Sequence, residues 1–211
     1  MKKIELAMLI GIVISVFCAG FCGFAEGYED ITDTVFRLHI LANSDSEEDQ
    51  QLKLKVRDAI LKECSYLFEN CSNAEESAEV AENNMFLIKK TAEKVIEENN
   101  KAYDIGCEVT EMMFDERVYD SVTMPAGEYT ALRITIGEAK GKNWWCVMFP
   151  PLCIPVATGE IEDYDDIFTT EEIDMLNNPE NYECRFYILE LIDKLGKRLS
   201  EQIGECANEN L

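Results

Sequence analysis

The chain contains a single histidine, His39, and nine cysteines, so a Cys–His hydrolase is the first chemistry to consider. Such an enzyme needs a thiolate beside an imidazole base, and Cys146 or Cys153 would supply the thiolate. His39 alternates with Arg37 inside a predicted strand, a pattern typical of an ordinary polar sheet face. We therefore predict that His39 is not catalytic and that the chain is not an enzyme. An extracytoplasmic cell-wall hydrolase of the Cys–His type is the alternative.

The remaining candidate sites lack the spacing that their chemistry requires. A phosphate-binding loop needs four residues between its glycines and Ser or Thr after the lysine, whereas three residues separate Gly137 from Gly141 and Asn143 follows Lys142. The acids at positions 162–166 lack the spacing of a calcium loop. One histidine and no CxxC pair make a zinc site a poor fit. We expect no metal and no cofactor.

Two adjacent tryptophans, Trp144 and Trp145, lie in a predicted strand that ends at a Pro-Pro pair. Neighbouring strand residues point to opposite faces, so both cannot fill the same core. Tryptophan is enriched at binding hot spots, and the rigid proline pair presents Leu152 with little ordering cost. We predict partner contact at these three residues, with packing in the core and at the sheet edge as the alternative.

Lys53 and Arg57 belong to the densest basic cluster of a chain whose net charge is −23. They are four residues apart and share one face of a predicted helix. This face either docks an acidic partner or is an ordinary exposed face paired with nearby acids. The strong negative charge argues against nucleic-acid binding and against broad contact with anionic lipid.

The N-terminus predicts export. Lys2 and Lys3 precede residues 6–25, which carry no charge and as a helix would span about 30 Å, the thickness of a bilayer core. The lysines should stay on the cytoplasmic side, so the rest of the chain emerges outside. The triplet at residues 23–25 suits signal peptidase. Residues 1–25 are therefore either a cleaved signal peptide or a retained membrane anchor.

The hydrophobic pattern predicts one α+β domain with an N-terminal strand, two helices, antiparallel strands and a C-terminal helix. The expected strands are 35–41, 105–110, 129–136 and 144–149. The expected helices follow the start signals at residues 43–48 and 72–76, and the second helix should end at residues 99–100. Residues 159–183 form an acidic excursion with few groups able to build a core, so we expect that it can be shortened. Residues 184–205 form an apolar C-terminal segment.

Cys146 and Cys153 flank the Pro-Pro pair, so we predict that they lie close enough for a disulfide.

Several blocks of the sequence resemble one known family, the stage II sporulation protein R family. The blocks are residues 37–46, 48–50, 54–59, 125–129, 131–137 and 141–153, within a core at residues 35–153. The most specific block is Gly141-x-Asn143-Trp144-Trp145-Cys146-Val147-x-Phe149-Pro150-Pro151-Leu152-Cys153. The chain departs from the family pattern at His39, where arginine is expected, at Met124, where an aromatic residue is usual, and at Arg117, where lysine is common.

The resemblance implies a signalling role. Members of this family are made in the forespore and secreted into the space between the forespore and mother-cell membranes. There they activate a membrane-embedded aspartic protease of the mother cell, which leads to pro-sigma-E processing. The resemblance thus implies a protein ligand with no catalysis of its own, which touches the membrane only through residues 6–25 if these are not cleaved. If they are retained, a membrane-tethered adaptor is a third interpretation.

Overall fold

A computed structural model of the chain describes residues 3–119, 122–150 and 168–182. Its contacts divide the chain into two units, which are described separately here. The larger unit comprises Ile31–Asp115 and Glu128–Thr169. The smaller unit comprises Met1–Asp30, Glu116–Gly127 and Thr170–Leu211.

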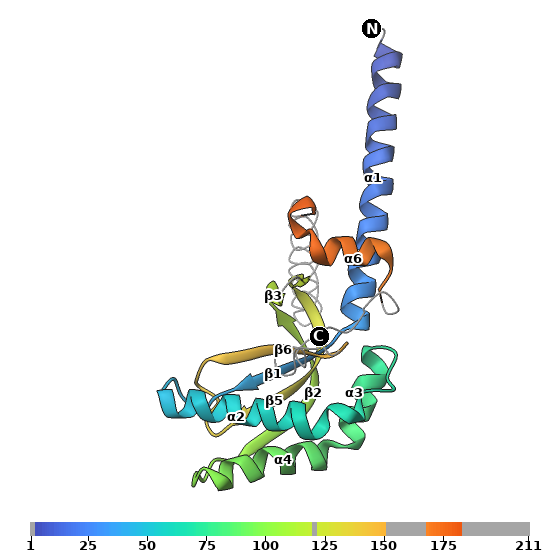
Figure 1. Ribbon diagram of the computed structural model, residues 1–211. Coiled ribbons are helices and arrows are strands. Elements are labelled where there is room, and N and C mark those ends of the chain that lie inside the picture. Colours follow the sequence, from blue (N-terminus) through green and yellow to red (C-terminus); the bar gives the residue numbers. More distant parts are fainter. Residues whose placement is uncertain (1–2, 120–121, 151–167, 183–211) are drawn as a thin grey trace, which may run out of the picture. The chain divides into compact units, whose positions relative to one another are not determined.

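The larger unit is built on a four-stranded sheet with the order β2-β5-β1-β6 (Figure 1). The strands are β1 (Phe36–Leu41), β2 (Ile105–Phe114), β5 (Gly127–Ile136) and β6 (Asn143–Phe149). β1 pairs with β6 in antiparallel and with β5 in parallel orientation. The sequence predicts antiparallel strands only. The parallel pair forms because the helices and β2 lie between β1 and β5 in the chain and provide the long crossover that such a pair needs.

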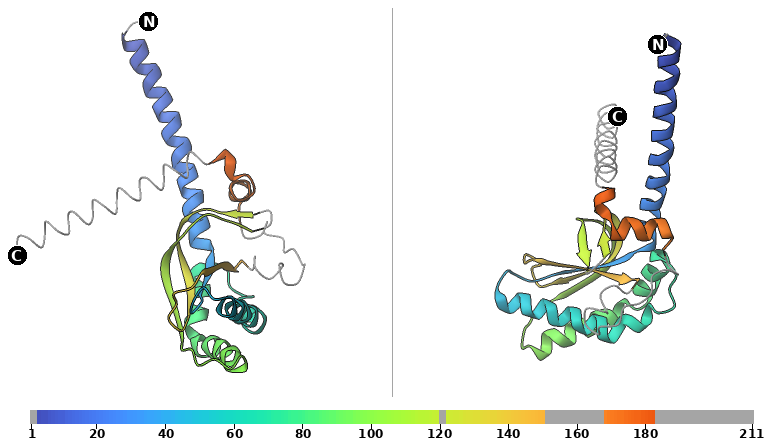
Figure 2. Two further views of the ribbon diagram at one scale, coloured as in Figure 1. Left: turned by 90° about the vertical axis from the view of Figure 1, so that its left-hand side faces the viewer. Right: turned by 45° about the horizontal axis from the view of Figure 1, so that its top comes forward.

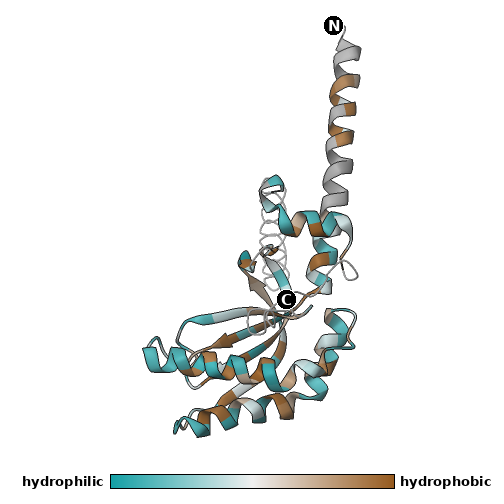
Figure 3. Cartoon of the chain, viewed as in Figure 1, coloured by the Kyte–Doolittle hydropathy of each residue, from teal (hydrophilic) through white to brown (hydrophobic). Residues whose placement is uncertain are grey.

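Helices cover one face of this sheet, as the views in Figures 1 and 2 agree. They are α2 (Glu47–Cys64), the 3-10 turn η1 (Ser65–Leu67), α3 (Ala74–Asn83) and α4 (Met85–Glu98). Hydrophobic and hydrophilic residues alternate along α2 and α4 in Figure 3, as expected of helices with one buried face. From β1, Leu38 and Ile40 point into this core and are fully buried. Each such side chain stabilises the fold by about 1.5–3 kcal/mol.

The helix starts follow the capping signals in the sequence. Ser46 caps α2 and accepts a hydrogen bond from the Asp49 amide at 3.2 Å, and Asn73 caps α3 in the same way. The sequence predicts a single helix from this second cap to residue 99, and this prediction is wrong. The helix is interrupted at Asn84, whose side-chain amide donates to the Val80 carbonyl at 2.8 Å and so competes with the backbone ladder. The α+β class itself is confirmed.

The smaller unit contains α1 (Lys3–Thr34, which extends into the larger unit), a hairpin of β3 (Arg117–Tyr119) and β4 (Val122–Met124), α6 (Thr170–Asn177) and η2 (Pro179–Asn181). The hairpin is absent from the sequence prediction because its strands are only three residues long.

Met175 and Leu176 on α6 are buried. The described part of the acidic excursion therefore does contribute apolar burial, contrary to the expectation for residues 159–183. Residues 159–167, and the C-terminal segment 184–205, lie outside the described residues.

Helix α1 includes the uncharged residues 6–25 and continues through the triplet at residues 23–25. Its apolar side chains near the N-terminus are at least half exposed: Met8, Leu9, Ile10, Ile12, Ile14 and Val16. In the part of the chain that the structure describes, no helix combines the length and the apolar character needed to cross a membrane. The assignment of residues 1–25 as a signal peptide or anchor stays a prediction.

Candidate partner-binding site

Strand β6 places its two tryptophans on opposite faces of the sheet, as their adjacency predicts. Trp144 lies opposite Ile40 in β1, on the face covered by helices, and Trp145 lies opposite His39 on the other face. Both tryptophans are half-buried. Neither tryptophan is fully buried in the core and neither is fully exposed.

On the helix face, Trp144 packs against the core and supports a cation from α2. The guanidinium carbon of Arg57 lies 4.2 Å from the centroid of the Trp144 ring. Both Nε and Nη2 of Arg57 donate to the same Asp58 oxygen, at 2.8 and 2.6 Å. A stack of this kind contributes about 0.5–2 kcal/mol. Arg57 is thereby held in one orientation with 21% of its side chain exposed.

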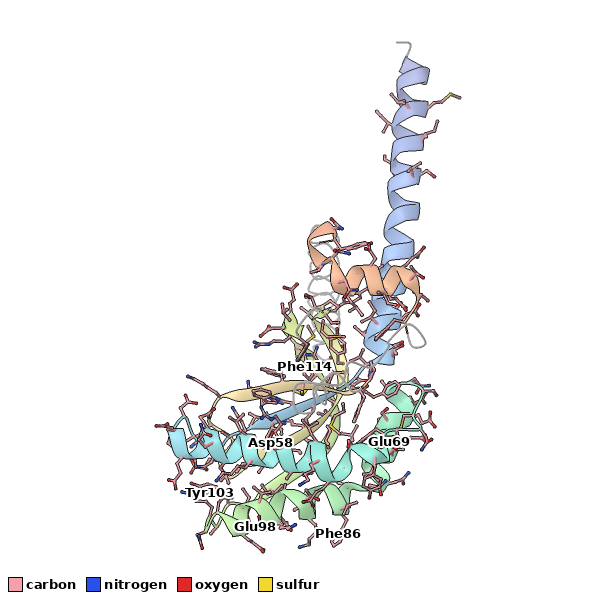
Figure 4. The ribbon with its side chains drawn as sticks, viewed as in Figure 1. Asp58, Glu69, Phe86, Glu98, Tyr103 and Phe114 are labelled. Carbon is pink, nitrogen blue, oxygen red and sulfur yellow. The ribbon has the colours of Figure 1, made fainter. Side chains whose placement is uncertain are left out.

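On the other face, Trp145 belongs to an aromatic layer. Its ring stacks on His39, with centroids 4.0 Å apart and planes 7° from parallel. Phe114 contacts Trp145 edge-on at 4.7 Å, and Figure 4 shows Phe114 on the side of the sheet away from α2. Phe114 also contacts Tyr129 edge-on, at 5.7 Å. Such edge-to-face and stacked pairs add about 0.5–1.5 kcal/mol each beyond area burial.

Burial lowers the pKa of His39 to about 4. The interaction with Asn143 opposes this with a smaller effect, and the positive charge of Arg133 lowers the pKa by a still smaller amount. The imidazole is therefore neutral at physiological pH. Neither of its ring nitrogens has a hydrogen-bond partner of normal geometry among the described residues. His39 acts here as a flat packing surface for Trp145.

Sequence reasoning missed the other members of this layer. Arg37 is fully buried, and its guanidinium carbon lies 4.2 Å from the Phe114 ring centroid and 4.8 Å from that of Tyr129. The alternation of Arg37 with His39 was the one available signal, since it puts both side chains on the face that carries Trp145. Phe114 and Tyr129 come from other strands, so no local pattern indicates them.

The polar residues after β1 join this strand to α2 and to residues 137–142, the loop between β5 and β6. Asn43 donates to the Asp49 carboxylate at 2.8 Å and accepts a hydrogen bond from the Glu138 amide at 3.0 Å. Asp45 accepts one from the Lys142 amide at 2.7 Å. These side chains are satisfied by the protein itself, so the Asn-Ser-Asp-Ser motif fixes the loop that precedes the tryptophans.

Lys53 strengthens the same junction from α2. Its ammonium donates to Gln50 Oε1 at 2.7 Å and to the carbonyl oxygens of Lys142 and Asn143 at 2.9 and 3.3 Å. It is only 4% exposed, and burial lowers the pKa of Lys53. The sequence interpretation of Lys53 as part of an exposed basic face is therefore wrong, because the loop after β5 folds over this side of α2. Of the two residues, Arg57 alone remains as a candidate contact.

A glycine allows this close approach. A Cβ atom on Gly141 would lie 2.2 Å from the Ser44 carbonyl oxygen, well inside van der Waals contact. Any larger residue would push the loop away from the β1–α2 junction. The site is thus a rigid loop and strand start from which Trp144 and Trp145 project.

The cysteines do not assemble a catalytic pair with His39 in the described residues. Cys146 lies opposite Leu38 on the helix face of the sheet, whereas His39 faces the other side. Cys146 is also disulfide-bonded, so it holds no thiolate. Cys64, Cys71 and Cys107 are free, and burial raises the pKa of Cys107 to about 11.

Some predicted site residues cannot be placed. Leu152 and Cys153 lie outside the described residues, so the contact at Leu152 and the pairing of Cys146 with Cys153 stay predictions. The described residues contain no group of three or more His, Cys, Asp or Glu side chains that could hold a metal ion.

Comparison with known proteins agrees with the resemblance seen in the sequence. Residues 32–158 match the family model described as stage II sporulation protein R. The chain is also similar to a Bacillus subtilis (strain 168) protein named stage II sporulation protein R, with 39% identity over 138 residues. That match covers 64% of this chain and 62% of the relative, so it spans less than two thirds of the relative's length. No solved structure matches. Because the family model covers more than half of the sequence, including β1, α2 and both tryptophans, the chain belongs to the stage II sporulation protein R family.

Proposed function

We propose that this chain is a secreted sporulation signal that activates a membrane-embedded aspartic protease of the mother cell and so leads to pro-sigma-E processing. The observation that carries the proposal is the family match over residues 32–158, which gives the chain a role in sporulation. The activation of this protease is the finer step that the family resemblance implies. It requires a protein contact rather than a reaction.

The geometry at the start of β6 supports a contact of this kind. Trp144 with Arg57 lies on one face, and Trp145 with His39 on the other, so the start of β6 presents partly exposed tryptophan and guanidinium groups held by packed neighbours. Tryptophan and arginine dominate protein-binding hot spots, and groups that are already ordered lose little entropy on binding. We place the contact with the protease here, on Trp145 and Arg57 in particular.

The arrangement of His39 weighs against the hydrolase alternative. A general base must lie within hydrogen-bond reach of its nucleophile and hold a pKa near the working pH. His39 lies on the opposite sheet face from Cys146 and is buried beneath Trp145 with its pKa lowered to about 4. A non-enzymatic ligand fits these features better.

The basic start and the uncharged residues 6–25 support export into the space between the forespore and mother-cell membranes. Cleavage after residue 25 would release the ligand. Retention would hold it at the forespore membrane as a tethered adaptor.

Co-expression in a bacterium that does not sporulate tests the proposal. Cells would carry the full chain, the membrane protease of the sporulating host and a tagged pro-sigma-E substrate, and processing would be followed by immunoblot. We expect processing only when all three are present, and equal processing with a His39→Phe variant that accumulates normally, because phenylalanine keeps a flat ring against Trp145 but cannot act as a base. Processing that does not require this chain, or that disappears with folded His39→Phe protein, would overturn the proposal.

A further inference from the structure

Strand β2 forms one edge of the sheet and is ten residues long. It runs antiparallel to β5, since the Asp104 carbonyl accepts from the Gly137 amide at 2.9 Å and Glu108 pairs with Arg133 at 2.9 Å. Among the described residues, no strand pairs with the outer edge of β2. Proteins commonly shorten, cover or bend such an edge, because its free backbone groups are a template for another strand.

The pairing with β5 fixes which backbone groups face outward. In an antiparallel ladder, alternate residues direct both N–H and C=O to the partner strand, and the residues between them direct both away. Asp104 bonds to β5, so even-numbered residues of β2 point to β5 and odd-numbered ones point outward. The outward set includes Cys107, Val109 and Glu111. The amides of these residues can be satisfied by water or by an added strand, and the Glu111 carbonyl also accepts a hydrogen bond from the Thr110 hydroxyl at 3.3 Å.

The negative charge along this edge favours an added strand that carries positive charge. Residues 102–116 contain no lysine or arginine, and they contain Asp104, Glu108, Glu111, Asp115 and Glu116. One of these acids, Glu108, is paired with Arg133, and its side chain is still 55% exposed. A second copy of β2 laid against the first would bring the same acids together, and residues 102–116 of that copy would add no cation. Like charges on paired strands are destabilising. A positively charged strand meets no such repulsion.

The side chains along β2 define the pattern further. Cys107 and Val109 are half-buried on the helix face, whereas Glu108 is exposed on the other face. An added strand alternates in the same way, so its side chains on the helix face would lie beside apolar neighbours and those on the other face beside an acid. A segment that alternates small apolar residues with lysine or arginine fits both faces.

We infer that the free edge of β2 binds an extended, positively charged segment of a partner protein, which joins the sheet as a fifth strand. Backbone hydrogen bonds would supply the affinity and the acids of β2 the selectivity for a basic segment. This inference goes beyond the proposed function. It concerns a surface on the opposite edge of the sheet from Trp144 and Trp145, and it holds for any partner with such a segment.

The test uses the full chain and a short synthetic peptide that alternates lysine with valine. Residue-resolved amide hydrogen exchange is measured with and without the peptide. The amides of Cys107, Val109 and Glu111 should exchange more slowly with peptide, while Thr110, whose amide already faces β5, should change little. A control peptide with glutamate in place of lysine should give no protection.

A matched pair of variants removes the outward donor at one position. Proline in place of Val109 lacks the amide and loses no bond to β5, whereas alanine keeps the amide. We expect Val109→Pro to weaken peptide binding about tenfold relative to Val109→Ala, the equivalent of one lost hydrogen bond to a bound strand.

Three results would overturn the inference: a peptide that binds without protecting the outward amides, equal protection by the glutamate peptide, or equal affinity of the two folded variants. Protection that rises with chain concentration in the absence of peptide would assign the edge to a second copy instead. If Val109→Pro does not fold, the hydrogen-exchange data with the two peptides still test whether the edge of β2 binds a basic strand. The experiment contains no protease, so its outcome is independent of the proposed function.

Discussion

Replacing Asp49 with asparagine tests the junction that holds the tryptophan-bearing strand in place. One carboxylate oxygen accepts hydrogen bonds from the side chains of Asn43 and Ser44, and the other accepts one from the Tyr103 hydroxyl at 3.1 Å. Asparagine converts one of these oxygens into an NH2 group. A side chain that donates a hydrogen bond to the carboxylate then faces this NH2 group, which is itself a donor.

The expected cost follows from the burial and the number of bonds. Asp49 is only 4% exposed, so water replaces the lost partners poorly. Hydrogen bonds to a charged group contribute about 1.5–3 kcal/mol each, and asparagine keeps part of the network, so we expect a loss of about 2–3 kcal/mol. Asp58→Asn is the matched control, because its side chain is 61% exposed and should cost less than about 0.5 kcal/mol.

The pH dependence gives a second, independent signature. Burial alone would raise the pKa of Asp49, but the hydrogen bonds donated to the carboxylate outweigh it and hold the pKa below its usual value of 3.8. A carboxyl with a depressed folded-state pKa stabilises the fold above its unfolded pKa, and this contribution is lost as pH falls through the folded value. The difference between wild type and Asp49→Asn should therefore be full near neutral pH and shrink below about pH 4.

Urea unfolding followed by tryptophan fluorescence measures both quantities on the full chain. The reasoning is refuted if Asp49→Asn loses no more stability than Asp58→Asn. It is also refuted if the loss is the same near neutral pH and well below pH 4, because the carboxylate charge would then contribute nothing.

Three further changes test other parts of the structure. Trp144→Ala removes a half-buried ring from the helix face and should cost about 2–4 kcal/mol in urea unfolding. As pH falls from 6.5 towards about 4, the wild type should lose stability, because the unfolded chain binds a proton at His39 before the folded chain does. In the same titration, the stability of His39→Gln should lack this pH dependence. Gly141→Ala places a Cβ 2.2 Å from the Ser44 carbonyl oxygen and should cost about 1–3 kcal/mol in thermal unfolding. Gly11→Ala in helix α1, with nothing within 4 Å, should not lower the midpoint, because alanine favours a helix over glycine.

Local patterns in the sequence predicted much of the larger unit. The alternation in residues 35–41 predicted β1 and its two faces, and the cap at Ser46 predicted the start of α2. The opposite orientation of Trp144 and Trp145 follows from their adjacency alone. The break at Asn84 was missed, although Asn83 and Asn84 signal it locally, because asparagine side chains hydrogen bond to the nearby backbone.

The features that could not be predicted depend on partners far along the chain. Lys53 is buried because its ammonium donates hydrogen bonds to carbonyl oxygens 89 and 90 residues later in the chain. No pattern within the helix contains that information. The layer around Trp145 combines residues from β1, β2, β5 and β6. The parallel register of β1 and β5 likewise depends on a long crossover. These contacts decide which predicted site residues are available to a partner.

We propose that this protein signals through a contact at Trp145 rather than through chemistry. The most direct measurement is pro-sigma-E processing in the co-expression system, normalised to the amount of folded chain, for Trp145→Ala and Phe86→Ala. Phe86 is 77% exposed on α4 and points away from the sheet in Figure 4, so it controls for the loss of an aromatic ring at a remote surface. We predict that Trp145→Ala abolishes processing and that Phe86→Ala leaves it unchanged. Normal processing by folded Trp145→Ala protein would contradict the account.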